Sequence, residues 1–118
     1  MKNYNFNVRT DINRAISLYN KTQTEVRFTT LDATLLNLLR SFSETKTEFY
    51  MSNKELSQIM VADPSTIQRS IDKLVDMKFV IKKIIYVDNR PKRILAYQKN
   101  NVEDTLHFGE LFGELFGE

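Results

Sequence analysis

Apolar residues recur at helical spacing in two segments of the first third of the chain. In residues 11–20 they stand at i, i+4 and i+7, which predicts a short amphipathic helix. A longer stripe runs through LDATLLNLLRSF, with apolar members Leu31, Leu35, Leu38, Leu39 and Phe42. Thr29 or Thr30 can cap this second helix, and Asp32 in its first turn suits the helix dipole. We expect it to be the central helix of the core.

Two further helices are predicted on either side of the stretch MVADPSTIQRSI, residues 60–71. Ser52 and Glu55 match a capping box and start a short helix, whose inward residues are Leu56, Ile59 and Met60. Asp63 and Pro64 form a second start signal, because aspartate caps helices well and proline suits the first helical position. The helix that follows carries one apolar stripe, made of Ile67, Ile71, Leu74 and Val75.

β-branched and aromatic residues dominate the segment after this helix. They predict a hairpin with strands near Val80–Val87 and Arg93–Gln98, joined by the polar turn Asp88–Lys92. A short strand is also expected at Phe49–Met51. The order of helices followed by a hairpin indicates an α+β fold.

The composition is that of an ordinary globular protein. The chain has 118 residues, which suffices for one domain, with 42% hydrophobic and 27% charged residues. No apolar run approaches the roughly 18 residues of a membrane span, and the start MKNYNFNVRTDINR lacks the apolar core of a signal peptide. We therefore expect a cytoplasmic protein that does not associate with a membrane.

The residue types needed for catalysis and metal binding are scarce. The chain has no cysteine and only one histidine, His107, so neither a zinc site nor a histidine-cysteine pair can be assembled. All three glycines lie in the last ten residues, so a phosphate-cradling loop is absent as well. We expect neither an enzyme nor a cofactor or metal.

Charge is unevenly distributed, although the net charge of the chain is only +2. Residues 64–99 carry nine basic and three acidic side chains, whereas residues 101–118 carry five acidic and no basic ones. A basic block beside an acidic tail indicates a polyanionic partner for the block; a solvated charged surface is the alternative.

Over residues 31–99 this order of two helices, a tight corner and a basic hairpin resembles the winged helix-turn-helix family. The family pattern across the corner, L-G-V-S-x-x-T-V-x-R-A-L, is matched by the cap and by Thr66, Ile67 and Arg69. Val61 departs from it, because the family usually has a glycine there in the left-handed conformation. The helices before and after the corner also look like those of plasmid and phage replication initiators and of small bacterial regulators.

The resemblance implies a helical core with a C-terminal β-hairpin wing that binds double-stranded DNA. We divide the chain into an N-terminal extension with a short helix over residues 1–28, the winged domain over 29–100, and an acidic Phe/Leu/Gly tail over 101–118. The second helix of the corner would enter the major groove, and the wing would contact the flanking backbone.

Eight residues are candidates for DNA contact. With the apolar stripe of the second corner helix buried, its outward residues include Ser65, Thr66, Gln68, Arg69 and Lys73. Gln68 suits adenine and Arg69 suits guanine, while the two hydroxyl residues and the helix N-terminus suit phosphate. At the predicted turn of the wing the candidates are Arg90, Lys92 and Arg93. The alternative is a solvated helix surface, with wing cations that only protect strand edges.

Three functions fit these observations. The first is a sequence-specific transcriptional regulator of a bacterial, phage or plasmid system. The second is a replication-initiation or partition protein of a plasmid or phage. The third, from a different class, is a winged-helix protein-interaction adaptor. In the DNA-binding readings we expect a homodimer, with the N-terminal helix or the tail as the candidate contact.

The tail HFGELFGELFGE repeats every four residues, with phenylalanines and leucines over residues 108–116. One interpretation is a motif that folds on a protein partner. Another is an acidic flap that competes with DNA for the basic surface, and a third is a tail packed on its own domain or disordered.

Overall fold

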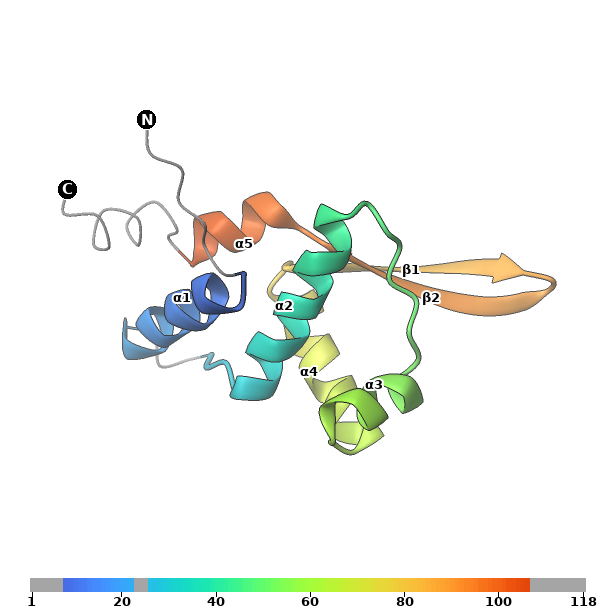
Figure 1. Cartoon of the computed structure of the whole chain (residues 1–118), viewed down its shortest axis with the longest axis horizontal. Coiled ribbons are helices and arrows are strands. Elements are labelled where there is room, and N and C mark those ends of the chain that lie inside the picture. The colour runs from blue at the N-terminus through green and yellow to red at the C-terminus, as the bar shows by residue number, and fades with distance from the viewer. Residues whose placement is uncertain (1–7, 23–25, 107–118) are drawn as a thin grey trace.

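The computed structural model describes residues 8–22 and 26–106, which form an α+β fold (Figure 1). The helices are α1 (Val8–Thr22), α2 (Thr30–Glu44), α3 (Asn53–Met60), α4 (Pro64–Asp76) and α5 (Lys99–Thr105), and the strands are β1 (Val80–Val87) and β2 (Arg90–Tyr97). The helices gather at one end, and the β1–β2 hairpin projects from them as a wing. The predicted winged helix-turn-helix arrangement is confirmed.

Helices α2 and α3 both begin with a complete capping box. Thr29 Oγ1 accepts the amide of Asp32, and the Asp32 carboxylate accepts the amide of Thr29. Ser52 and Glu55 exchange the same pair of bonds at α3, as the sequence predicts. The cap expected from Asp63 is absent, because this residue precedes α4 but its side chain makes no capping bond. Pro64 stands in the first turn of α4, where its missing amide costs no hydrogen bond.

The core is built around α2 and α4. Leu35, Leu36 and Leu39 of α2 are almost completely buried, and the predicted stripe of α4 packs against them. The Phe28 ring stacks on Phe79, with ring centroids 5.4 Å apart, and closes the core beyond the end of α4. Because removing a buried isoleucine or leucine side chain costs about 2–5 kcal/mol, this stripe fixes the rotation of α4 about its axis.

The hairpin turn is shorter than predicted. Val87 pairs directly with Arg90, so only Asp88 and Asn89 form the turn, both with positive φ (53° and 63°). Aspartate and asparagine tolerate the left-handed conformation that a two-residue hairpin turn requires. The expectation of a five-residue turn reaching Lys92 is wrong, because Pro91 lies within β2.

The strand expected at Phe49–Met51 is reduced to a single bridge. Phe49 pairs with Leu95 of β2, and the Leu95 amide donates to the Phe49 carbonyl at 2.9 Å. The Phe49 side chain is buried. This contact ties the loop between α2 and α3 to the base of the wing.

The helices at the two ends of the described chain also contribute to the core. α1 begins earlier than the predicted residue 11 and buries Ile12, Ala15 and Ile16. The sequence pattern predicts no helix at α5, yet this helix forms and buries Val102, and Leu106 directly after it is buried as well. No helix among the described residues is long and apolar enough to cross a membrane. The repeats at 108–116 lie outside those residues.

Candidate nucleic-acid interface

The corner between α3 and α4 adopts the left-handed geometry that the family pattern implies. Val61 has φ 51° and ψ 56°, and its side chain is 91% exposed. Beyond it the Ala62 amide donates to the Ser57 carbonyl at 3.2 Å, and the Ser57 hydroxyl donates to the Ala62 carbonyl. The chain therefore keeps the tight corner with a β-branched residue at the position where glycine is usual.

The N-terminal part of α4 presents an exposed polar surface. Ser65 and Arg69 are exposed, and Thr66 is half-buried. Arg69 Nη2 donates to Thr66 Oγ1 at 3.2 Å, so the guanidinium lies along the first turn of the helix. Because Asp63 leaves the first turn without a side-chain cap, the amides there stay open to an external acceptor such as phosphate.

Gln68 is held by neighbours within the protein. Its Oε1 accepts from Asn53 Nδ2 at 2.7 Å, and its Nε2 donates to Asp72 Oδ1 at 2.8 Å. Bidentate recognition of adenine uses both of these groups. The amide of Gln68 is therefore engaged on both sides in the described structure.

Lys73 is turned toward the core and pairs with the buried Asp32. Its Nζ lies 2.6 Å from Asp32 Oδ2 and donates to the Arg27 carbonyl at 3.0 Å. The Ser70 hydroxyl donates to Asp32 Oδ1 at 2.5 Å. Since Asp32 also completes the capping box of α2, one carboxylate joins the start of α2 to the middle of α4.

The position of Asp32 in the first turn of α2 predicts only a favourable charge for the helix dipole, not this buried role. A signal was present, because Ser70 falls three residues after Ile67 and next to Ile71, on the inward surface of α4. A hydroxyl on an inward helical stripe requires a buried partner. Asp32 lies on the stripe of α2 and supplies it.

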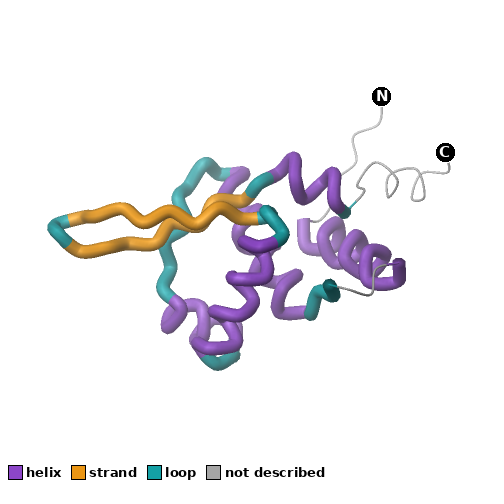
Figure 2. The backbone as a smooth tube through the Cα atoms, turned by 180° about the vertical axis from the view of Figure 1, so that it is seen from behind, coloured by secondary structure: helices purple, strands orange, loops and turns teal. Residues whose placement is uncertain are grey.

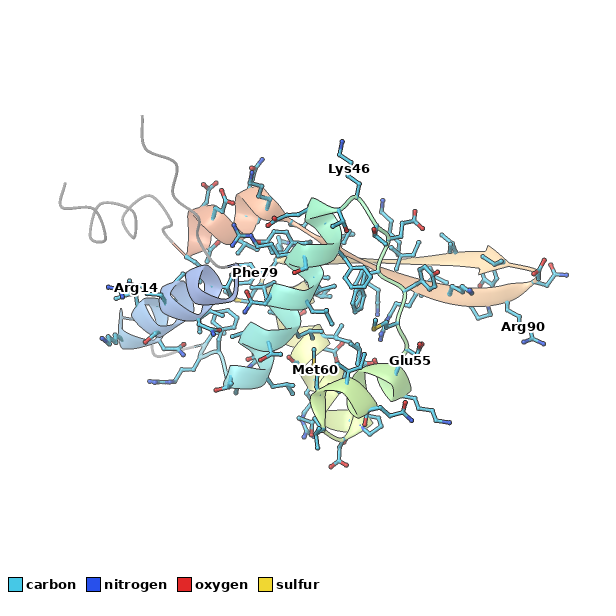
Figure 3. All side chains as sticks on the ribbon, viewed as in Figure 1. Arg14, Lys46, Glu55, Met60, Phe79 and Arg90 are labelled. Carbon is cyan, nitrogen blue, oxygen red and sulfur yellow. The ribbon has the colours of Figure 1, made fainter. Side chains whose placement is uncertain are left out.

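The three basic candidates of the wing differ in their surroundings. Arg90 is exposed near the tip of the hairpin, far from the helices (Figure 3). Lys92 Nζ lies 5.0 Å above the centre of the Tyr50 ring, a cation–π contact. Arg93 is half-buried: its Nη1 donates to Asn53 Oδ1 at 2.6 Å, its Nη2 donates to the Met51 carbonyl at 2.7 Å, and burial lowers its pKa.

Asn53 links α4 to the wing. Its amide nitrogen donates to Gln68 of α4, while its amide oxygen accepts from Arg93 of β2. We call the chain Gln68–Asn53–Arg93 the helix–wing bridge. It fixes the start of α3, the exposed surface of α4 and the base of the wing relative to one another, although these segments are distant in sequence.

Solved structures resemble this chain in fold. A possible transcriptional regulator from Methanosarcina mazei Go1 matches with a TM-score of 0.52 and 21% identity, over 99% of this chain and 91% of that one. A protein from the thermoacidophilic archaeon Sulfolobus tokodaii matches with a TM-score of 0.55 and 17% identity, over 89% and 97% of the two chains. No family model and no curated protein matches the sequence at a significant level. At these identities the likeness extends to the fold, an α+β arrangement shared with a possible regulator of transcription.

Proposed function

We propose that this chain is a cytoplasmic protein without catalytic activity that binds double-stranded DNA with sequence preference and regulates transcription. The observation that carries the proposal is the helix–wing bridge. It holds the exposed polar start of α4 and a basic wing in one fixed arrangement, as a protein that reads one DNA site with both elements requires. The similar fold of a possible transcriptional regulator supports the same reading.

The contacts around each of the eight candidate residues divide them into a group assigned to DNA contact and a group assigned to positioning. Ser65, Thr66 and Arg69 are assigned to DNA on α4, with Arg69 reading a guanine and the hydroxyls meeting phosphate. On the wing, Arg90 and Lys92 are assigned to the DNA backbone. Three residues are assigned to positioning, because their polar groups already bind other parts of the protein: Gln68, Lys73 and Arg93.

Binding of duplexes across a salt series tests the proposal. Arg69→Ala removes a base contact, so we expect preference at one base pair to relax by about 1–3 kcal/mol. Lys92→Ala removes a phosphate contact, so we expect it to weaken all duplexes alike and to reduce the salt slope by about 0.9. Fluorescence anisotropy with the selected site and a scrambled duplex measures both effects.

The matched control is Arg14→Ala, because this exposed arginine of α1 lies far from α4 and the wing (Figure 3). It should change neither preference nor slope. Weak binding that does not respond to salt would refute DNA binding and favour the adaptor function. Footprinting then separates the two DNA-binding functions, since protection of a promoter supports regulation and protection of tandem repeats at an origin supports replication or partition.

A further inference from the structure

The outer strand of the wing is unusually apolar for a surface strand. β1 has the sequence VIKKIIYV, and only Val80 at its base is buried. Five large apolar residues along it are between 38% and 73% exposed: Ile81, Ile84, Ile85, Tyr86 and Val87. Figure 2 shows this part of the hairpin standing clear of the helices. Because successive strand residues point to opposite faces, Ile81, Ile85 and Val87 lie on one face and Ile84 and Tyr86 on the other. Exposed apolar residues on both faces of a strand favour an interaction site.

The backbone of β1 is also unpaired along its outer edge. Among the described residues the sheet has two strands, and the one additional bridge, Phe49 to Leu95, lies on the β2 side. Because the Leu95 amide points toward Phe49, it points away from its partner Lys82, and the pair Lys82–Leu95 is a non-hydrogen-bonded one. The alternation of antiparallel pairs then directs the amides and carbonyls of Lys82, Ile84 and Tyr86 outward.

The two edges of the hairpin differ in how they are protected. On the β2 edge Pro91 offers no amide, and the loop at Phe49 covers the base. Proline and covering loops are the means by which sheet edges avoid pairing with other chains. β1 carries neither of these. Its only charged residues are Lys82 and Lys83, so its edge is open to a further strand in a register that keeps these two lysines away from other cations.

The side-chain order of β1 makes the strand complementary to itself. In a symmetric antiparallel pair a residue at the centre faces its own copy, and two registers pair seven residues of β1. The register centred on Lys83 places two ammonium groups directly opposite each other, which is unfavourable. The register centred on Ile84 instead places Ile84 against Ile84, Lys82 against Tyr86 and Ile81 against Val87.

We propose that two copies of this chain associate through β1, pairing antiparallel with Ile84 at the two-fold axis. The wings then form one four-stranded sheet, and each lysine of β1 faces an apolar or aromatic residue of the other copy. The outward surface of α4 takes no part in this contact. The proposal is independent of DNA binding.

Sedimentation velocity on the full chain tests the association. We expect a concentration-dependent dimer, and Ile84→Arg should shift the boundary to the monomer because it places two cations at the two-fold axis. Ile59→Arg is the matched control, since Ile59 of α3, which the sequence pattern predicts to face inward, is instead 57% exposed, against 51% for Ile84, and lies outside the wing. It should leave the dimer intact, and circular dichroism verifies the fold of both variants. A monomer at every concentration, or dissociation by Ile59→Arg alone, overturns the proposal.

Cross-linking tests the register, because the chain has no cysteine of its own. Oxidised Ile84→Cys should form a covalent dimer, since the two sulfur atoms meet at the axis. In Ile81→Cys the two sulfurs lie about 20 Å apart along the strands, beyond the reach of a disulfide. Equal cross-linking of the two variants would exclude this register.

Discussion

Val61 shows how one residue sets the geometry of the corner at a cost in stability. A non-glycine residue in the left-handed region loses about 1–2 kcal/mol, and a β-branched side chain is among the least suited to it. The Val61 side chain is almost fully exposed, so little burial offsets that cost. The corner requires a left-handed backbone at residue 61, and the valine side chain adds little to the stability of the protein.

Val61→Gly should therefore stabilise the protein. Relief of the left-handed strain exceeds the extra backbone entropy that glycine loses on folding, which is about 0.5–1 kcal/mol. We expect a net gain of about 0.5–1 kcal/mol in the free energy of unfolding, measured by urea denaturation. Val61→Ala is the control, because it keeps a Cβ atom and should gain clearly less. A loss of stability on Val61→Gly would show that the valine side chain has a role of its own.

Asp32 has the opposite character, because its buried carboxylate accepts hydrogen bonds from three partners at once. Asp32→Ala leaves the Thr29 amide, the Ser70 hydroxyl and the Lys73 ammonium without this acceptor. Loss of a cap together with a buried hydrogen bond predicts destabilisation by about 2–4 kcal/mol in thermal or urea unfolding. Glu44→Ala removes an ion pair whose carboxylate is 53% exposed, and it should cost less than about 1 kcal/mol. Equal losses of unfolding free energy in Asp32→Ala and Glu44→Ala would show that the buried contacts of Asp32 do not stabilise the fold.

At the scale of elements, the capping box of α3 makes the start of this helix sensitive to acid. Hydrogen bonds from the Ser52 amide and hydroxyl lower the pKa of Glu55 below its ordinary value of 4.5. A lowered folded pKa means that the contribution of this box is complete above pH 4.5 and is lost as the pH falls through the folded pKa. We expect the Ser52 amide to lose hydrogen-exchange protection in that window, and Glu55→Gln, which keeps an acceptor, to remove the pH dependence. The same pH dependence in Glu55→Gln would assign it to another group.

The elements also show which features could be read from the sequence. Helices α2, α3 and α4 follow from apolar spacing and capping residues, which act locally. The polar run Asp88–Lys92 predicts a five-residue turn, whereas in the structure Arg90, Pro91 and Lys92 belong to β2 and Pro91 occupies a non-hydrogen-bonded position opposite Tyr86. The sequence does not show that Lys73 and Arg93 bind within the protein, unlike the other basic candidates. Their partners Asp32 and Asn53 lie some 40 residues away in the chain.

At the scale of the whole molecule, the core lies at one end and the wing extends from it. The outer part of the wing has few buried contacts, whereas Leu74 and Phe79 are completely buried. In dilute solution we expect the amides of Ile85 and Val87 to exchange through local opening, with far lower protection than the amide of Leu74. Amide exchange followed by NMR measures this gradient. Uniform protection would mean that the wing and the core open as a single unit.

The helix–wing bridge has a consequence for the thermodynamics of recognition. A flexible wing would have to be ordered at the moment of contact, and that loss of entropy would weaken binding. Here Asn53 already holds the base of the wing against α4 in the free protein. A mismatched base pair at the position that Arg69 contacts would then also move the wing away from the phosphates. The binding free energies lost in Arg69→Ala and Lys92→Ala would therefore not be additive. Cutting the bridge with Asn53→Ala would make the two contacts independent and leave a protein that binds more weakly but tolerates more sequences.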